Sequence, residues 1–433
     1  MKISVIGAGL AGCEAAHQLS KRGYKVDLYE MKPKKYTPAH HYEGLCELVC
    51  SNSLKAMRIE SAAGLLKAEM ELMGSLVIEC AKKTSVPAGG ALAVDRTLFS
   101  DMVTKCITDN PNINLISKEV TEIPDGPVII ATGPLTSEAL TEKISALCGQ
   151  SLYFYDAAAP IVTFESIDKD KVFFAARYGR GDDDYINCPF EKEEYEAFYN
   201  ELINAETVPL KEFELKVYEG CMPIEVLAKR GMDSMRFGPL KPVGLTNPNT
   251  GRRPYANLQL RKENCDGTLY NLVGFQTNLK FGEQKRVFSM IPGLSNAEFM
   301  RYGVMHRNTF INGPLVLERN FRFKTNKNIY FAGQITGVEG YIESAMSGIV
   351  AGISMARQLN GKYEIEFPLT TMTGALINHT VSVTANYQPM GCNMGILPPL
   401  PERIKNKEER YGALSKIALS DMQDILKKAG EVI

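Results

Sequence analysis

Runs of apolar residues alternate with amphipathic segments near both ends of the chain. The first apolar run covers residues 2–6, and a second run, 25–30, ends in Glu30. Between them lie a glycine-rich turn and a segment with helical periodicity. The same patterns predict further strands at 114–116, 127–131 and 329–333, and helices over 61–80, 95–110 and 343–359. Strands that alternate with helices in this way predict an α/β fold with a parallel sheet.

The pattern changes in the middle of the chain. Short strands are predicted at 161–164 and 172–175, followed by an acidic helix over 191–204. From Gly220 to Arg307 the chain is rich in Gly, Pro, Asn and basic residues and has few long helical periods. We therefore expect a discontinuous nucleotide-binding domain made of residues 1–150 and 310–433, with an inserted α+β domain over 151–309.

The turn after the first strand has the glycine spacing of a dinucleotide-binding motif. Gly7 supplies the backbone angles of the turn, Gly9 lets the main chain approach a pyrophosphate, and Gly12 allows the helix to lie close to the strand. The N-terminus of the helix offers free N–H groups to the phosphates, and Glu30 follows at the distance of a ribose-binding carboxylate. The predicted cofactor-binding residues are therefore Gly7, Ala8, Gly9, Leu10, Ala11, Gly12 and Glu30.

Two later glycine turns favour FAD as the dinucleotide. One follows the strand 127–131, and the other follows the strand 329–333 and precedes a helix, whose N-terminus would stabilise negative charge on a reduced flavin. Together with the first turn they resemble the glutathione-reductase-like flavoproteins and imply a Rossmann-like FAD-binding domain. In that group an Asp usually stands where this chain has Gln334. The turns add Thr132, Gly133, Gly333, Gln334, Glu339 and Gly340 to the predicted cofactor-binding residues.

Composition limits the class of protein. The 433 residues are 45% hydrophobic and 23% charged, as in globular proteins, and they exceed one ordinary core. No apolar run reaches the length of a membrane span, and the first strand leaves no room for a signal peptide, so a cytoplasmic location without a membrane partner is expected. The ten cysteines are expected to be reduced, and none forms a C-x-x-C pair, so no metal site is expected.

Charge points to a local site for nucleic acid. The formal net charge of −1 excludes a global basic field, and no DNA partner is expected. Residues 211–330, however, contain 19 Lys and Arg against 10 Asp and Glu, an excess of nine. Such an excess is what a local patch for nucleic-acid phosphates would need, although any one pair taken alone is more typical of a solvated surface. It includes the pairs Lys229–Arg230, Arg252–Arg253, Arg261–Lys262 and Lys285–Arg286.

Longer blocks of sequence resemble a known family over nearly the whole chain. These blocks are residues 38–40, 47–54, 219–225, 236–245, 270–286, 301–310 and 333–341. They are similar to the small Gid-type family of folate- and FAD-dependent tRNA (uracil-5-)-methyltransferases. A larger relative that modifies the tRNA wobble position shares the flavin domain but carries a long helical C-terminal region, which this chain lacks.

The resemblance implies a reaction. A one-carbon unit would pass from 5,10-methylenetetrahydrofolate to C5 of the T-loop uridine (uridine-54) of tRNA, with FAD and NAD(P)H as reductants. Three alternatives stay open: the same chemistry on a ribosomal RNA uridine, a flavin oxidoreductase of small molecules, and an inactive FAD scaffold. The oligomeric state is not indicated.

Two cysteines lie in blocks that the resemblance marks as functional. Uracil C5 is a poor nucleophile, and addition of a thiolate to C6 would activate it. We expect Cys221 to be this nucleophile and Cys50 to be a partner thiol at the flavin, and the reverse assignment stays open. The pterin is expected to stack on the flavin or on an aromatic such as Tyr341, with an Arg or Lys on its anionic tail. His306 receives no role, and Glu339 and Glu343 are expected only to line the flavin site.

Overall fold

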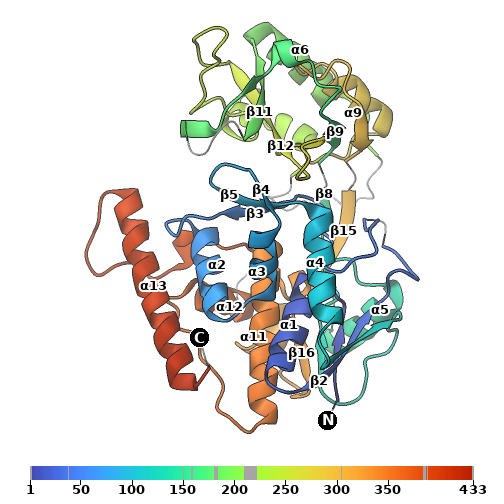
Figure 1. Ribbon diagram of the computed structural model, residues 1–433, viewed down its shortest axis with the longest axis vertical. Coiled ribbons are helices and arrows are strands. Elements are labelled where there is room, and N and C mark those ends of the chain that lie inside the picture. Colours follow the sequence, from blue (N-terminus) through green and yellow to red (C-terminus); the bar gives the residue numbers. More distant parts are fainter. Residues whose placement is uncertain are drawn as a thin grey trace.

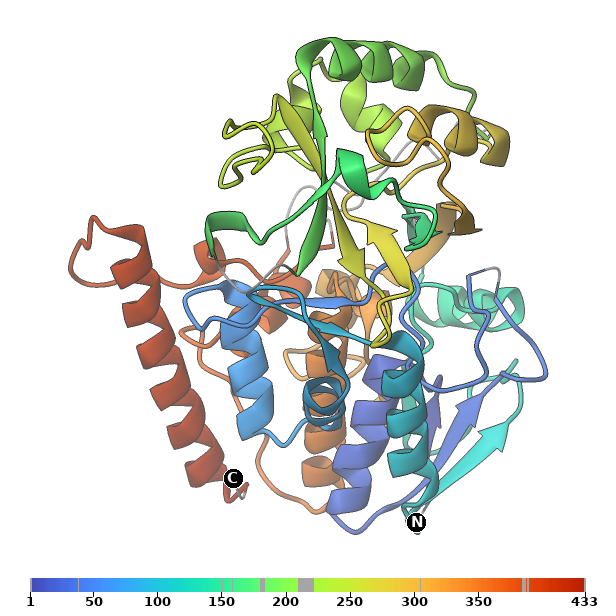
Figure 2. The same ribbon diagram turned by 45° about the horizontal axis from the view of Figure 1, so that its top comes forward.

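The computed structural model describes residues 2–37, 39–149, 151–157, 159–179, 184–208, 222–303, 305–383, 387 and 389–431. The chain forms two lobes, with the smaller lobe standing on the larger (Figures 1 and 2). Both chain ends lie in the larger lobe, so the smaller lobe is an insertion in the sequence of the larger.

A five-stranded parallel sheet is the centre of the larger lobe. Its strands follow the order β16-β7-β1-β2-β6, and each pair of neighbours is parallel. The strands are β1 (Lys2–Ile6), β2 (Lys25–Glu30), β6 (Ile113–Ser117), β7 (Val128–Ile130) and β16 (Ile329–Phe331). Because the strands are parallel, the carboxyl ends of β1, β7 and β16 meet at one edge, where ligands of such sheets bind. The glycine turns that follow these strands are thereby brought together.

Helices α1 (Leu10–Lys21) and α11 (Tyr341–Leu359) pack against each other beside this sheet. A Cβ on Gly348 would lie 2.1 Å from the carbonyl oxygen of Ala11, so the contact requires glycine at that position. The other helices of the larger lobe are α2 (Ala62–Leu72), α3 (Leu76–Lys83), α4 (Arg96–Thr108), α5 (Glu138–Cys148), α10 (Gly313–Val316), α12 (Met372–Val381) and α13 (Lys407–Ala429).

The single helix predicted over 61–80 is wrong. The segment forms α2 and α3, which are separated at Gly74. Gly74 has a φ of +72°, which ends the first helix, and the Ser75 hydroxyl accepts a hydrogen bond from Ile78 N at 3.1 Å and begins the second. A glycine followed by an N-cap serine is the local signal that the helical periodicity concealed.

Two buried glutamates tie helices together. Glu14 of α1 accepts hydrogen bonds from Ser75 Oγ and from the N–H groups that begin α3, including Val77 N at 2.9 Å. Glu69 of α2 likewise accepts from Met372 N at 2.7 Å and Thr373 N at 2.8 Å, which begin α12. Burial raises the pKa of each carboxyl to about 7, against the effect of these hydrogen bonds. The carboxyls thus satisfy helix N-termini that would otherwise be buried without partners.

The smaller lobe is built on an antiparallel sheet of order β10-β11-β12-β13-β9-β14. Its core is rich in aromatic side chains, among them Phe190, Tyr195, Phe198, Phe275 and Phe288. The strands are β9 (Ile161–Thr163), β10 (Phe173–Phe174), β11 (Tyr185–Phe190), β12 (Ala256–Lys262), β13 (Leu269–Leu272) and β14 (Phe299–Arg301). The helices are α6 (Lys192–Asn204), α7 (Ile224–Ala228), α8 (Ser234–Phe237) and α9 (Phe281–Phe288).

The lobes meet at two small sheets. Strands β8 (Ser151–Ala157) and β15 (Met305–Ile311) pair antiparallel and carry the chain between the lobes. Strands β3 (Ser53–Ala56), β4 (Ser85–Val86) and β5 (Ala91–Val94) form the upper surface of the larger lobe. The domain boundaries placed at residues 150 and 310 stay a prediction, because β8 and β15 link the two lobes. Within the described ranges, every helix is too short or too polar to cross a membrane.

Candidate functional site

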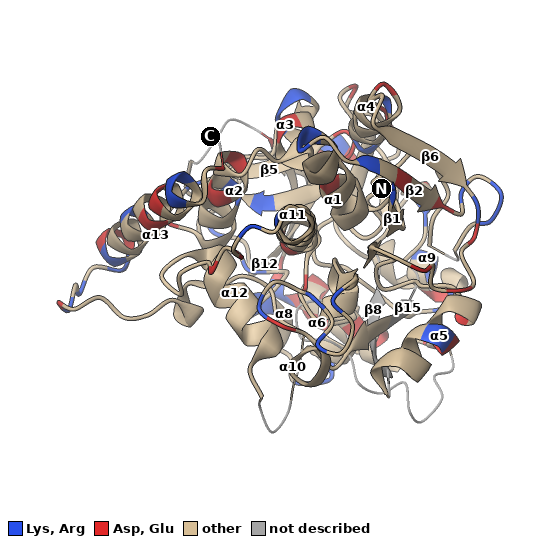
Figure 3. Cartoon of the chain, turned by 90° about the horizontal axis from the view of Figure 1, so that it is seen from below, with Lys and Arg blue, Asp and Glu red and all other residues tan. Residues whose placement is uncertain are grey.

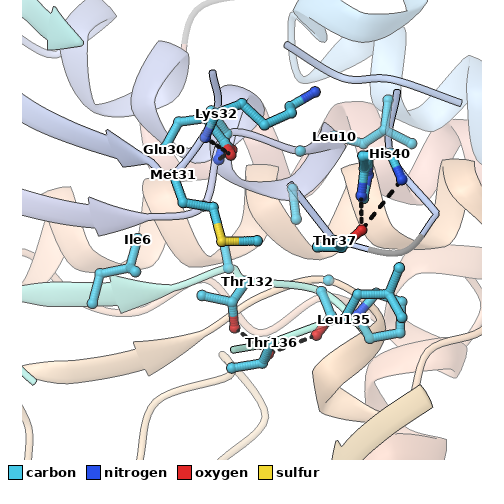
Figure 4. A pocket seen from close by; sticks show the side chains of 18 of the residues that line it. Ile6, Leu10, Glu30, Met31, Lys32, Thr37, His40, Thr132, Leu135 and Thr136 are labelled. Carbon is cyan, nitrogen blue, oxygen red and sulfur yellow. Dashed lines mark hydrogen bonds between the residues drawn. The ribbon is translucent and has the colours of Figure 1, made fainter. Parts of the chain in front are cut away.

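A pocket opens where the three glycine turns meet at the edge of the parallel sheet (Figure 4). It extends from the first turn of α1 to Cys50 and Tyr341. The residues predicted to bind the cofactor that line it are Gly7, Ala8, Gly9, Leu10, Ala11, Glu30, Thr132, Gly133, Gly333 and Gln334. Gly12, Glu339 and Gly340 do not line it.

The glycines of the first turn do different things. A Cβ on Gly7, whose φ is +96°, would lie 2.6 Å from the carbonyl oxygen of Ala131, and one on Gly12 would lie 1.7 Å from the carbonyl oxygen of Gly7. These two glycines therefore allow helix α1 and the neighbouring strands to lie close to each other. Gly9 differs, because a Cβ there would meet nothing within 4 Å. Since Gly9 also lines the pocket, a side chain at this position would occupy ligand space.

The polar groups around this turn fit an adenine dinucleotide. Helix α1 begins at Gly9 with no side-chain cap, and no described group accepts a hydrogen bond from the N–H of Gly9, Leu10 or Ala11. Such N–H groups, at the positive end of a helix, suit a pyrophosphate. The Glu30 carboxylate accepts from Ala8 N and Lys32 N, each at 3.0 Å, which fixes it in the pocket with lone pairs left for ribose hydroxyls.

A thiol and a phenol meet at the other end of the pocket. The Tyr341 hydroxyl accepts hydrogen bonds from Cys50 N at 2.9 Å and Ser51 N at 3.2 Å, and it lies 3.0 Å from Cys50 Sγ. Two N–H donors fill both lone pairs of the phenol oxygen, so its own proton points to the sulfur. Burial raises the pKa of Tyr341 well above its usual value, which keeps that proton in place. The arrangement therefore favours the thiolate form of Cys50.

Arginines from both lobes hold the segment that carries Cys50. Arg96 of α4 donates to the carbonyl oxygens of Leu48 at 2.5 Å and Val49 at 2.9 Å, and also to Glu263 of the smaller lobe. Arg261 of β12 donates to Ser51 Oγ at 2.7 Å and to Asn52 Oδ1 at 2.8 Å. The segment that carries the thiol is thus held by contacts from both lobes.

Sequence reasoning missed Arg96 and misplaced Arg261. The pair Arg261–Lys262 was predicted as part of an RNA-binding surface, but the Arg261 side chain lies inside the lobe junction and is 7% exposed. Apolar and polar residues alternate over 256–261, which is the pattern of a strand, but the structure buries all of these positions, so the pattern alone does not reveal that Arg261 is buried. A second missed group is Thr37 with His40, whose hydroxyl and ring nitrogen lie 2.6 Å apart in the pocket wall (Figure 4).

The residues left without a role support the start of α11. Glu343 is buried and accepts from Lys55 Nζ at 2.7 Å and Cys392 N at 3.0 Å. Glu339 accepts from the Gln334 side chain at 2.5 Å. Gly340 begins the helix with a φ of +120°. These contacts fix the turn that carries Gln334 and Tyr341 into the pocket.

Three predicted positions cannot be placed. Cys221 lies outside the described residues, as does Pro38, and the side chain of His306 is not described. The assignment of Cys221 as the nucleophile therefore stays a prediction. Among the described residues there is no cluster of His, Cys, Asp and Glu that could hold a metal ion.

The excess of Lys and Arg in the smaller lobe is partly neutralised by ion pairs with glutamates. Lys280 pairs with Glu206 at 2.5 Å, and Arg286 pairs with Glu283 at 2.8 Å. Arg252 and Arg253 remain exposed on the surface. Viewed from below, the larger lobe shows both signs of charge interspersed, for example along α13 (Figure 3). Lys229, Arg230 and Lys285 are exposed as well, so several cations of the smaller lobe are available for an RNA contact.

Comparisons with known proteins show which family the chain is similar to. The model of the family described as glucose inhibited division protein A matches residues 2–363. A methylenetetrahydrofolate–tRNA-(uracil-5-)-methyltransferase TrmFO of Acetivibrio thermocellus is 59% identical over 431 residues, which are 98% of this chain and 99% of that protein. The protein of the same name from Listeria innocua is 57% identical over 432 residues, 99% of each chain.

A solved structure shares the fold. GidA of Aquifex aeolicus, in one crystal form, superposes with a TM-score of 0.70 at 16% identity, over 99% of this chain and 78% of that one. At this identity the likeness concerns the fold alone. Together with the parallel sheet, it confirms the predicted Rossmann-like α/β class.

Proposed function

Because this chain belongs to the glucose inhibited division protein A family, we propose that it methylates C5 of a uridine in tRNA. The carbon donor is 5,10-methylenetetrahydrofolate and the redox cofactor is FAD. One observation carries the proposal: a pocket built for a dinucleotide ends at the thiol of Cys50, whose sulfur lies 3.0 Å from the Tyr341 hydroxyl. The T-loop uridine is the proposed acceptor, NAD(P)H the proposed reductant, and the cytoplasm the proposed location.

The residues of the pocket have separate tasks. The N–H groups of Gly9, Leu10 and Ala11 would hold the pyrophosphate of FAD, and Glu30 would hold its ribose. When bound, FAD supplies the hydride that turns a methylene group on the base into a methyl group. A hydrogen bond donated by the Tyr341 hydroxyl would stabilise a thiolate at Cys50, at the end of the pocket next to this chemistry.

Activation of the base is the task of the second cysteine. In our proposal the Cys221 thiolate adds to uracil C6, and the electron pair of the C5–C6 bond moves onto C5 and O4. C5 then attacks the electrophilic methylene carbon and forms a C–C bond to it. Loss of the C5 proton expels the folate nitrogen and leaves an exocyclic methylene on the base. After a hydride adds to this methylene, the electron pair restores the C5–C6 double bond and the sulfur leaves from C6. The base must leave its stack in the RNA to reach the thiol. The reverse assignment of the two cysteines predicts a different outcome in the experiment below.

The experiment is reconstitution with unmodified tRNA, methylenetetrahydrofolate and NADPH, followed by quantification of 5-methyluridine by mass spectrometry. Product should require the folate and the reductant together. Cys221→Ala should abolish product while the protein stays yellow with bound flavin. Cys106→Ala, which removes an exposed thiol of α4, serves as the matched control and should behave as wild type.

Three results would change the proposal. Absence of product from folded, yellow protein with every substrate present would contradict it. Normal turnover of Cys221→Ala with loss of turnover in Cys50→Ala would reverse the two cysteines. Faster methylation of ribosomal RNA than of tRNA would change the acceptor but not the chemistry.

A further inference from the structure

Arg301 has an unsatisfied guanidinium in the junction between the lobes. It ends β14, the edge strand of the smaller lobe's sheet, where it lies opposite Ile161 of β9. Its Nε and Nη2 atoms are shielded from solvent and have no hydrogen-bond partner among the described residues. Buried donors without acceptors cost free energy, and a charged group costs more than a neutral one. This cost is relieved if the two donors meet an acceptor that arrives with a ligand.

The charges around Arg301 leave it without a counter-ion. Its charge interacts with those of Arg96 and Glu263 and with the side chains of Tyr341 and Cys50. The Glu263 carboxylate is already held by Arg96, with Oε2 at 2.6 Å from Arg96 Nε and Oε1 at 3.3 Å from Nη2. Burial and the nearby Arg96 lower the pKa of Arg301 to about 10, so the guanidinium still carries its charge at neutral pH. Among the described residues, no carboxylate is therefore left to accept hydrogen bonds from Nε and Nη2 of Arg301.

The two unsatisfied atoms are the pair that forms a fork. In arginine, the Nε–H and Nη2–H bonds point the same way along one edge of the planar guanidinium. This edge fits two coplanar oxygens at once, as in a carboxylate, and makes two charge-assisted hydrogen bonds to them. A ligand with a single oxygen would leave one donor unsatisfied.

The backbone next to Arg301 is fixed. Gln284 of α9 is fully buried and clamps Gly303 from both sides: Gly303 N donates to Gln284 Oε1 at 2.8 Å, and Gln284 Nε2 donates to Gly303 O at 2.8 Å. The Tyr302 ring stacks on Phe281 at 5.0 Å and on Phe299 at 5.4 Å between centroids. The start of the arginine side chain is therefore held in place before any ligand arrives, which reduces the entropy cost of binding.

We propose that Arg301 binds a carboxylate of the glutamate tail of the folate substrate. This inference depends on the proposed function, because it names how the proposed carbon donor is held. A tetrahydrofolate whose reactive end lies at the thiol end of the pocket brings carboxylates on the same molecule into the lobe junction. The two donors lie inside the lobe junction, whereas the exposed Arg252 and Arg253 are better placed to contact an RNA backbone.

The test measures binding to the FAD-loaded enzyme by two ligands, tetrahydrofolate and tetrahydropteroate, which lacks the glutamate. Wild type should bind tetrahydrofolate about 10- to 100-fold more tightly, as expected for hydrogen bonds to a charged group. Arg301→Met should bind both ligands equally, at the weaker affinity. Arg301→Lys keeps the charge without the fork and should show an intermediate ratio. Arg403→Met, which removes an exposed arginine of the larger lobe, should keep the wild-type ratio.

The outcomes separate this assignment from its alternatives. Arg301→Met should melt at the same temperature as wild type or higher, because it removes an unpaired buried charge. A lower melting temperature with an unchanged ligand ratio would assign Arg301 a structural role and overturn the proposal. An unchanged ratio with weaker tRNA binding would assign it to an RNA phosphate and also overturn it. Failure of wild type to bind tetrahydrofolate at all would contradict the proposed function itself.

Discussion

The two lobes present ligand groups by different means. The larger lobe uses its backbone: Gly7 and Gly12 bring helix and strand together, and Gly9 leaves the pocket open in front of free N–H groups. The smaller lobe instead extends long charged side chains, Arg261 and Arg301, from an antiparallel sheet. A backbone subsite requires particular residue spacings along the chain, whereas a side-chain subsite depends on how distant segments meet. The first kind is therefore visible in a sequence and the second is not.

The cores of the lobes show the same contrast. In the larger lobe, small residues let α1 and α11 approach so closely that a Cβ on Gly352 would lie 2.9 Å from the carbonyl oxygen of Ala15. In the smaller lobe, aromatic rings fill the space between sheet and helices, and Phe275 meets Phe288 edge to face at 5.4 Å. The close packing of backbones in the larger lobe tolerates no added atom at these glycines. The aromatic core of the smaller lobe leaves the sequence on that lobe's surface free to vary.

Replacement of the first-turn glycines should have the largest effect. Gly12→Val places a Cβ 1.7 Å from the carbonyl oxygen of Gly7, which the fold cannot accommodate without moving α1. We expect it to lower the free energy of unfolding by about 3 kcal/mol or more, seen as a fall in melting temperature. Gly9→Val should fold normally and yield colourless protein, because its side chain enters only the pocket.

Gly90 provides a control for the comparison of the first-turn glycine variants. Gly90 also has space around its Cβ and a backbone that other residues adopt, but it lies outside the pocket, so Gly90→Ala should keep both flavin and stability. If Gly12→Val kept the wild-type melting temperature, or Gly9→Val kept the flavin, the division of tasks among the first-turn glycines would be wrong.

The contrast between backbone subsites and side-chain subsites also explains how much of the molecule could be predicted from the sequence. The parallel strands at 2–6, 127–131 and 329–333 and the glycine turns after them were predicted because their signals are local. The break at Gly74 was missed because the apolar periodicity of α2 and α3 runs across it. At the site, Glu30 and the turn glycines were found from spacing. The roles of Arg96 and Arg261 could not be found in this way, because each depends on a carbonyl or hydroxyl of the segment 48–52. Arg261 is separated from that segment by more than 200 residues of chain.

Removing the Arg261 guanidinium, by which the smaller lobe holds the segment that carries Cys50, should have an intermediate effect. Arg261→Met deletes the hydrogen bonds to Ser51 Oγ and Asn52 Oδ1 and releases the segment that carries Cys50. We expect kcat to fall about 100-fold with KM for tRNA little changed, since misplacement of a reacting group by about 1 Å has this cost. Flavin binding, measured by absorbance, should stay intact because the backbone subsite is untouched.

Two further variants sharpen this result. Arg261→Lys should recover part of the activity, because it can keep one of the two hydrogen bonds but not the fork. Lys171→Met, an exposed change in the same lobe, should leave kcat unchanged. Loss of flavin in Arg261→Met would show that the two subsites are not separable, and the contrast between the lobes would fail.

Removing the Tyr341 hydroxyl should have the smallest effect, because the thiol keeps its place and loses only one donor. Tyr341→Phe deletes the hydrogen bond to Cys50 Sγ at 3.0 Å and removes the oxygen that accepts from Cys50 N and Ser51 N. The bond favours the thiolate, so its loss should slow alkylation of Cys50 by iodoacetamide about tenfold at pH 7, equivalent to about 1.4 kcal/mol. The deficit should shrink as the pH rises and the thiol ionises without help, and it should stay at about tenfold as the pH falls. Peptide mass spectrometry follows Cys50 separately from the other thiols, with Cys50→Ala as the background. A deficit that is the same at every pH would mean that Tyr341 limits access to the sulfur and does not stabilise its charge.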